Sequence, residues 1–346
     1  MMTYEMLSEP IRKYIRDKKW ESLRPIQEAA IQKIINTDLN YVLISRTASG
    51  KTEAAFLPIL SKVNFKENGV KVLYISPLIA LINDQFLRVE QLCEHLDISV
   101  TKWHGEASKG KKDQLLKNPN GVLLITPESI EAMFCNKPHN ILQLFSSLEY
   151  IVIDEIHNFL GSDRGIQLQS LIHRIKIISS KKVAIIGLSA TVSDVNQYSE
   201  LKFYLGEPNN TKIIRDTTPK PINASFRYFE SLTTNLSLDL LKDLYRETYN
   251  CKALIFPNAR GKVEEVAVKL KKISEKVGGH PNFFAHHSAV DKETREYVEF
   301  FAKSQLQQNF TISCTSTLEL GIDIGNVEKV IQIDATQRIA SLVKRI

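Results

Sequence analysis

Short apolar, β-branched runs alternate along the chain with longer segments in which apolar residues recur at helical spacing. Runs followed directly by turn residues predict β-strands, and the segments between them predict amphipathic helices. In the first half the predicted strands are 41–44, 72–75, 99–103, 122–125, 150–153 and 183–188. This alternation is typical of an α/β fold, with a mostly parallel sheet flanked by helices.

The second half repeats the pattern, so the chain resembles two copies of one architecture. Its predicted strands are 224–228, 252–256, 283–285, 310–314 and 330–333, and its predicted helices include 262–273 and 292–301. Turn formers and prolines gather at 205–210 and 216–221, where a helix cannot continue. We therefore expect a first domain at 1–210, a linker at 211–221 and a second domain at 222–346.

The amino-acid composition indicates a globular protein and says little about its function. The 346 residues are 43% hydrophobic and 24% charged, which is ordinary for a globular protein of two domains. The four cysteines form no C-x-x-C pair, and no apolar run reaches the ~18 residues of a membrane span. We expect a reduced, cytoplasmic protein without membrane contact. The net charge of +6 permits a polyanionic partner without indicating one.

The strand at 41–44 leads into Ser-Arg-Thr-Ala-Ser-Gly-Lys-Thr at 45–52, and a helical segment follows directly. Such a loop points backbone N–H groups at phosphates, while Lys51 reaches the outer phosphates and Thr52 ligates Mg²⁺. The predicted nucleotide-binding residues here are Thr47, Ala48, Ser49, Gly50, Lys51 and Thr52. Ser45 replaces the first glycine of the strict P-loop pattern, so a small-residue turn is the alternative.

Two adjacent acids end the strand at 150–153, followed by isoleucine and histidine. In a nucleotide site Asp154 would hold Mg²⁺ and Glu155 would polarise the attacking water, because open α/β sheets bind ligands at the carboxyl ends of their strands. A solvated turn or a helix cap is the alternative. The P-loop that precedes the acids in the expected order favours the nucleotide site.

The string Asp-Glu-Ile-His at 154–157 is identified as the signature of DExH helicases of superfamily 2, and the chain most resembles Lhr-type (large helicase-related) proteins. The resemblance implies two tandem RecA-like P-loop domains, the second incomplete at its C-terminus. It implies an ATP hydrolase that uses ATP and Mg²⁺ and acts on DNA or RNA. Lys51, Asp154, Glu155 and His157 are the catalytic residues that it implies.

Further motifs of the first half match the same family. Arg-Pro-Ile-Gln at 24–27 resembles the Q motif, in which Gln27 reads adenine, although Gln27 fits an exposed helix position equally well. Segments 74–84 and 125–129 resemble motifs Ia and Ib, which implies nucleic-acid backbone contacts at Ser76, Pro77 and Thr126. Arg164 and Gly165, after the acids, are a further similarity. Segment 188–191 resembles motif III, and its coupling residues are Ser189, Ala190 and Thr191.

Two segments of the second half resemble motifs IV and V of the same family. Segment 253–260 resembles motif IV and ends at Arg260, an implied nucleic-acid contact. Segment 314–325 is a close match to motif V, which implies a backbone contact from Thr315 and nucleotide-side roles for Gly321 and Asp323. The adjacent His286 and His287 suggest a metal, but no third ligand lies at a suitable spacing.

Motif VI of this family carries arginines that act on the γ-phosphate, whereas this chain stops after Lys344, Arg345 and Ile346. We expect either a shortened chain or a partner chain that supplies the arginines, and weak hydrolysis by the chain alone.

The main hypothesis for the function is a helicase or translocase motor core. The alternatives are a nucleotide-dependent nucleic-acid clamp with little hydrolysis, and a P-loop kinase or transport ATPase. DNA against RNA, polarity and pathway stay open.

Overall fold

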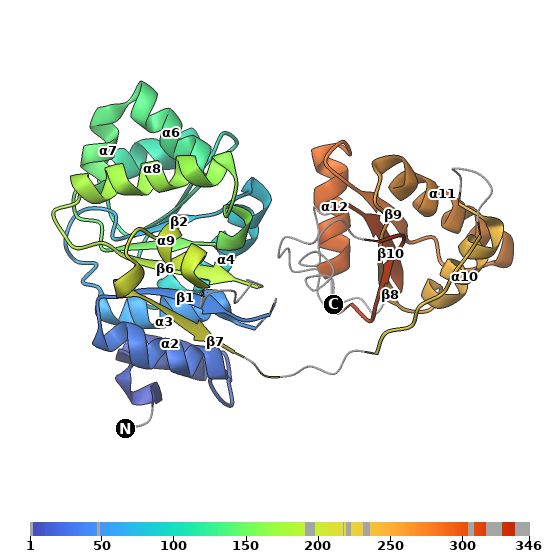
Figure 1. Ribbon diagram of the computed structural model, residues 1–346, viewed down its shortest axis with the longest axis horizontal. Coiled ribbons are helices and arrows are strands. Elements are labelled where there is room, and N and C mark those ends of the chain that lie inside the picture. The colour runs from blue at the N-terminus through green and yellow to red at the C-terminus, as the bar shows by residue number, and fades with distance from the viewer. Residues whose placement is uncertain are drawn as a thin grey trace. The chain divides into compact units, whose positions relative to one another are not determined.

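The computed structural model describes residues 3–46, 49–190, 198–216, 218, 223–230, 236–303, 308–315 and 327–335. The chain divides into two compact units, Met1–Thr218 and Pro219–Ile346. Each unit contains a parallel sheet with helices packed against it (Figure 1). The predicted α/β fold is confirmed.

The sheet of the first unit has seven strands in the order β3-β4-β2-β5-β6-β1-β7. All neighbouring strands pair in parallel. Strands 1 to 6 coincide closely with the apolar runs of the first half. The strands are β1 (Asn40–Ile44), β2 (Val72–Ile75), β3 (Val100–Trp103), β4 (Val122–Ile125), β5 (Tyr150–Ile153), β6 (Ala184–Ser189) and β7 (Thr211–Arg215).

Helices cover both faces of this sheet, because alternate side chains of each inner strand point to opposite faces and both sets are apolar. In β2, Val72 and Tyr74 pack into one hydrophobic core, whereas Leu73 and Ile75 pack into the other. Figure 1 shows α2 and α3 on one side and α6, α7 and α8 on the other. The helical elements are η1 (Thr3–Met6), α1 (Glu9–Asp17), α2 (Pro25–Asn36), α3 (Lys51–Lys62), α4 (Ile79–Glu94), α5 (Lys109–Lys117), α6 (Pro127–Asn136), α7 (Pro138–Phe145), η2 (Ile156–Asn158), α8 (Asp163–Ile178), α9 (Ser199–Tyr204) and η4 (Pro208–Asn210).

The predicted linker at 211–221 is wrong at its start. Residues Thr211–Arg215 form β7, which pairs with β1 from Asn40 to Ile44. The turn formers just before them make η4, and the chain then re-enters the sheet instead of leaving the unit. A five-residue edge strand between proline-rich segments carries too weak a periodic signal to be separated from a linker.

The second unit contains a four-stranded parallel sheet in the order β11-β8-β10-β9. A smaller hydrophobic core joins this sheet to α10 and α11. Its elements are α10 (Leu238–Thr248), β8 (Lys252–Phe256), α11 (Arg260–Val277), β9 (Phe283–His286), α12 (Lys292–Lys303), β10 (Phe310–Cys314) and β11 (Lys329–Gln332).

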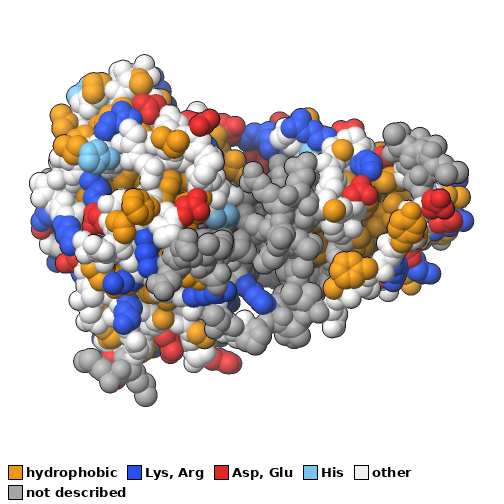
Figure 2. All heavy atoms as spheres, in the orientation of Figure 1, with side chains coloured by type: hydrophobic (Ala, Val, Ile, Leu, Met, Phe, Trp, Pro, Cys, Tyr) orange, Lys and Arg blue, Asp and Glu red, His pale blue; other side chains and the backbone are white. Residues whose placement is uncertain are grey.

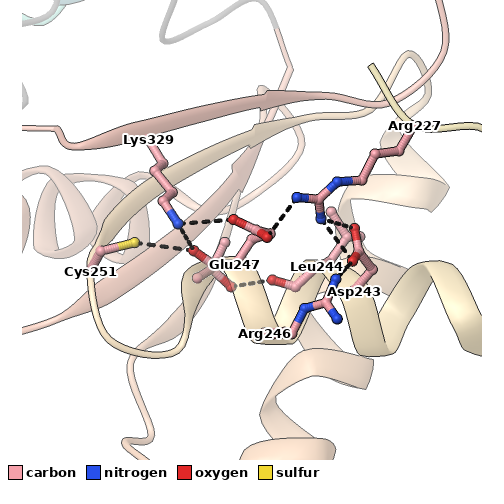
Figure 3. A network of polar contacts seen from close by, with 8 residues as sticks. Arg227, Asp243, Leu244, Arg246, Glu247, Cys251 and Lys329 are labelled. Carbon is pink, nitrogen blue, oxygen red and sulfur yellow. Dashed lines mark hydrogen bonds and ion pairs between the residues drawn. The ribbon is translucent and has the colours of Figure 1, made fainter. Parts of the chain in front are cut away.

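Residues 224–228, predicted as a strand, pair with no sheet among the described residues. Ion pairs anchor this segment instead (Figure 3): Arg227 contacts Asp243 at 2.7 Å and Glu247 at 2.9 Å, both on α10. Glu247 also contacts Lys329 of β11 at 2.9 Å. Phe226 and Tyr228 are 96% and 89% exposed, so these two aromatic side chains are not packed into a core among the described residues.

Within the described ranges, each helix is too short or too polar to cross a bilayer.

Candidate nucleotide site

The order of the strands brings three loops of the first unit together. Strand β6 lies between β1 and β5 and pairs with both in parallel, so the carboxyl ends of all three strands meet at one edge. The Ser45 N–H, just after β1, donates to the Ser189 carbonyl oxygen at the end of β6 at 3.1 Å. The P-loop segment, the acidic segment and the Ser-Ala segment therefore lie side by side, although more than 100 residues separate the first from the second in sequence.

Gly50 lets the P-loop turn into α3. Its φ is +81°, a left-handed conformation that glycine adopts without strain, and a Cβ there would lie 2.5 Å from Gln27 Nε2. No side chain caps the N-terminus of α3. Because the first N–H groups of a helix attract anions, this end of α3 is suited to phosphate. Ser49 also lies here, with its hydroxyl 2.5 Å from that of Ser45; Thr47 and Ala48 lie outside the described residues.

Lys51 is buried, and its ammonium group lies under the loop. Its Nζ donates to the Ser45 carbonyl oxygen at 2.8 Å and to the Arg46 carbonyl oxygen at 2.6 Å. Bonds from a buried ammonium to neutral carbonyl groups of its own loop can be exchanged for stronger bonds to charged phosphate oxygens. The phosphate role of this lysine stays a prediction.

Gln27 is only 2% exposed, so its interpretation as an exposed helix residue is wrong. Its Oε1 accepts from the Arg24 N–H at 2.9 Å and completes the N-terminus of α2, and its Nε2 donates to the Gly50 carbonyl oxygen at 3.5 Å. The side chain thus joins α2 to the glycine of the P-loop. The adenine-reading role stays a prediction.

The acidic segment is held in a strained turn after β5. Glu155 has φ +46°, a left-handed conformation that is uncommon outside glycine and often occurs at functional sites. The Glu155 N–H donates to Asp154 Oδ1 at 2.9 Å. Glu155 Oε2 lies 3.0 Å from His157 Nε2, and His157 Nδ1 lies 2.8 Å from the Ser189 hydroxyl. The His157 ring therefore lies between the predicted water-activating acid and the predicted coupling residue.

The electrostatics of the site centre on Asp154, which is 7% exposed. Burial raises the pKa of this carboxyl above its usual value, while the Tyr74 hydroxyl and the Lys51 ammonium act against the rise. Burial and the neighbouring Asp154 likewise raise the pKa of Tyr74 well above its usual range. A divalent cation bound here would stabilise the charged form of Asp154 and relieve this unfavourable burial.

Two residues that sequence reasoning did not select also line the site. Tyr74 of β2 is fully buried beside Asp154. Gln85 of α4 accepts a hydrogen bond from the Thr52 hydroxyl through its Oε1 at 2.9 Å, so it orients the side chain predicted to ligate Mg²⁺. Gln85 is a polar residue on the apolar face of a helix, a signal that was visible in the sequence. Tyr74 reads as an ordinary apolar strand residue and gives no such signal.

The described residues contain no group of three or more His, Cys, Asp or Glu side chains able to hold a metal. A cation between Thr52 and Asp154 would therefore take most of its ligands from phosphate oxygens and water, the usual arrangement for Mg²⁺. The two predicted protein ligands fit a cation that arrives with a nucleotide.

The predicted nucleic-acid residues of the first unit lie at the carboxyl ends of β2 and β4, and their side chains are buried. Ser76 is 0% exposed, and Thr126 is 5% exposed and caps α6 by accepting from the Ser129 N–H at 3.3 Å. Pro77 is buried as well. Figure 2 shows basic, acidic and apolar side chains interspersed over the visible face of this unit. Contacts at these loops would therefore involve backbone groups and neighbouring exposed side chains.

In the second unit, Arg260 is exposed at the start of α11, and the Thr315 N–H, just after β10, donates to the His286 carbonyl oxygen at 3.2 Å. His286 and His287 contact separate carboxylates, Glu299 at 3.0 Å and Glu264 at 2.9 Å. These pairs give each histidine a structural partner.

The structure leaves three predicted site residues undescribed: Gly321, Asp323 and Thr191. Ala190, a predicted coupling residue, follows β6 and is 9% exposed.

The first unit has the features of a P-loop nucleotide-binding domain. A glycine-lysine loop follows β1 and leads into a helix without a side-chain cap, and an acid pair follows β5 of the same parallel sheet. The model of the DEAD/DEAH box helicases matches residues 24–198, and that of the helicase conserved C-terminal domain matches residues 236–346. The chain belongs to the DEAD/DEAH box helicase family, and the resemblance to Lhr-type proteins is confirmed.

Relatives support this assignment over nearly the whole chain. It is 31% identical to the ATP-dependent helicase Lhr-Core of Saccharolobus solfataricus and 32% identical to that of Methanocaldococcus jannaschii, with 99% of the chain covered in each case. It spans 41% and 42% of the length of these relatives. The structure of Mycobacterium smegmatis helicase Lhr bound to ssDNA and AMP-PNP matches with a TM-score of 0.83 and 28% identity, and covers 100% of this chain and 46% of that one.

Proposed function

We propose that the chain is the motor core of an ATP-dependent helicase, which couples ATP hydrolysis to movement along, or unwinding of, DNA or RNA. One observation carries the proposal. The carboxyl ends of three adjacent strands bring together Lys51, Asp154 and a row of contacting side chains, Glu155, His157 and Ser189.

The side chains divide the chemistry between them. The uncapped N-terminus of α3 and Lys51 would bind the phosphates, and Thr52 and Asp154 would hold Mg²⁺, which neutralises developing charge on the phosphates when bound. Glu155 would orient and polarise the attacking water. Because His157 joins Glu155 to Ser189, a change at the acid would reach the segment proposed to couple hydrolysis to movement.

Nucleic acid would bind at the loops after β2 and β4 of the first unit and at Arg260 and Thr315 of the second. Backbone contacts of this kind predict little sequence preference and an affinity that falls steeply with salt. The relatives named as ATP-dependent helicases, and the match to a helicase bound to ssDNA, support this assignment. A cytoplasmic location belongs to the same proposal.

The test is the ATPase rate of the chain with and without single-stranded DNA and RNA, compared with Lys51→Ala and with Lys62→Ala as a matched control. Lys62 is at the other end of α3 and pairs with Asp38 at 2.7 Å, away from the site. We expect an oligonucleotide to raise the rate, Lys51→Ala to reduce nucleotide affinity or turnover at least about tenfold, and Lys62→Ala to behave like wild type.

The ratio of rates with and without oligonucleotide is the decisive quantity, since it does not depend on how fast the chain is in absolute terms. Oligonucleotide binding without any stimulation would contradict the motor and support a clamp. Unchanged activity of Lys51→Ala would contradict the nucleotide site itself.

A further inference from the structure

The side chain of Arg164, in the first turn of α8, reaches two loops that follow other strands of the first sheet. Its Nε donates to Glu128 Oε1 at 2.6 Å, and its Nη2 donates to Glu128 Oε2 at 3.0 Å and to the Pro77 carbonyl oxygen at 2.6 Å. Pro77 follows β2, and Glu128 lies in the first turn of α6 after β4. One guanidinium group therefore holds both loops that are proposed to contact nucleic acid.

The two loops are already joined beneath this contact. The Ser76 N–H donates to the Ile125 carbonyl oxygen at 3.1 Å. Because the side chains of Ser76 and Thr126 are buried, the rim of the loops is formed by Glu128, which is exposed, and by partly exposed neighbours. Arg164 bridges the loops at this rim, where a nucleic-acid backbone would lie.

The other side of Arg164 is fixed against the acidic segment. Its guanidinium lies 5.4 Å from the centre of the Phe159 ring, one residue after η2. The next residue, Gly165, has no space for a side chain, since a Cβ would lie 1.8 Å from the Phe159 carbonyl oxygen. The Ser162 hydroxyl caps α8 by accepting from the Gly165 N–H at 3.2 Å and donates to that same Phe159 carbonyl at 2.8 Å. The first turn of α8 is therefore packed and hydrogen-bonded against the end of the segment that carries Glu155 and His157.

Arginine is the residue that this arrangement requires. A planar guanidinium offers donors in a fixed fork, so it binds both oxygens of a carboxylate and a carbonyl at once, whereas a lysine ammonium acts as a single flexible point charge. The Arg164 and Glu128 side chains are 34% and 55% exposed. A pair so open to solvent adds little to folding stability, which suggests that its value lies in position.

We propose that Arg164 is a positioning residue that links the state of the acidic segment to the two nucleic-acid loops, so that bound nucleotide and bound nucleic acid change each other's affinity through it. This inference rests on the proposed function. A shift of the acidic segment moves α8, and the Arg164 fork transfers that shift to Pro77 and Glu128 together.

A second arginine of α8 provides a matched control. Arg174 pairs with Glu131 of α6 at 3.1 Å and lies 4.3 Å from the centre of the Phe134 ring. Like Arg164, it pairs with a glutamate of α6 and lies against an aromatic ring, but both of these contacts are on α6 and neither is with the loop at Pro77 or with the segment that carries Glu155 and His157. A purely structural role predicts equal behaviour of the two arginines, whereas a positioning role predicts a difference.

The experiment measures the affinity of the whole chain for a fluorescein-labelled single-stranded oligonucleotide, as DNA and as RNA, by anisotropy with and without Mg²⁺ and AMP-PNP. The ratio of the two dissociation constants is the coupling factor, which is typically about 5- to 150-fold in coupled systems. We expect Arg174→Ala to keep the wild-type factor and Arg164→Ala to bring it within about twofold of one. Arg164→Lys should give an intermediate factor and serves as the variant to compare if Arg164→Ala unfolds.

Glu128→Ala completes a double-mutant cycle. If the pair acts as one unit, Arg164→Ala with Glu128→Ala lowers the coupling factor no further than either change alone. Wild-type coupling in both Arg164 variants, or equal losses in the Arg164 and Arg174 variants, overturns the inference while leaving the motor intact. The proposed function itself is overturned if the wild-type chain binds no oligonucleotide, or if its affinity for the oligonucleotide is the same with and without AMP-PNP.

Discussion

At the scale of single residues, the nucleotide site combines groups that are unfavourable when the site is empty. Asp154 is a buried carboxyl whose pKa burial raises, and Glu155 has a left-handed backbone conformation. Both features make sense where a cation and phosphates complete the electrostatics, because active sites often sacrifice stability for function.

This conflict predicts that Asp154→Asn stabilises the first unit while it removes function. The pKa of Asp154 is higher in the folded state than in the unfolded state, so the folded state retains the proton as pH rises. Folding stability is therefore lost as pH rises from the unfolded value through the folded one, and the loss is complete above it. At neutral pH, with EDTA and no nucleotide, the variant should be more stable by on the order of 1 kcal/mol, and its advantage should shrink toward pH 4.

Trp20 and Trp103 both lie in the first unit, so urea unfolding followed by tryptophan fluorescence reports that unit alone. Asp113→Asn, at an exposed position of α5, is the control for the loss of one carboxylate. An Asp154→Asn variant less stable than wild type at neutral pH would show that the carboxylate is favourably buried.

At the scale of elements, the close approach of Gly165 in α8 to the Phe159 carbonyl group determines how α8 packs against the segment after β5. A Cβ on Gly165 would lie 1.8 Å from the Phe159 carbonyl oxygen, and a Cβ on Gly187 of β6 would lie 2.9 Å from Ile156 Cδ1. A side chain at position 165 would meet backbone and push α8 away from this segment, whereas one at position 187 would meet the movable end of a side chain.

Gly165→Ala is expected to destabilise the first unit by about 1 to 3 kcal/mol, the usual range for overpacking, since the new methyl group meets backbone and cannot be avoided by a rotamer change. Gly110→Ala, in α5, is the control: its nearest atom would be 3.9 Å away, and alanine favours helix. The measurement is the urea midpoint by tryptophan fluorescence. Equal midpoints for the two variants would contradict the tight packing of α8.

At the scale of the whole molecule, the boundary of the first unit lies after β7. All five residues of β1 are buried between β6 and β7. A unit that stopped before β7 would leave β1, the strand that leads into the P-loop, as an open edge with unpaired backbone groups.

A fragment of residues 1–218 is therefore expected to fold and to bind nucleotide, whereas a fragment of residues 1–210 should unfold at a lower urea concentration and tend to aggregate. Tryptophan fluorescence and size-exclusion chromatography compare the two. If the shorter fragment matched the longer in stability and nucleotide affinity, β7 would be dispensable and the earlier boundary would be adequate.

The sequence by itself determined the α/β class and, within the described residues, every strand except β7, because these depend on local periodicity. It also singled out the P-loop and acidic segments through the fixed spacing of short motifs. It did not reveal β7, nor that 224–228 stays outside a sheet, since pairing depends on whether a partner edge is available. Only the tertiary structure showed that Tyr74 and Gln85 belong to the site and that Arg164 joins two distant loops. These contacts join segments that are far apart in the sequence, and the order of the strands in the sheet decides which of these segments become neighbours.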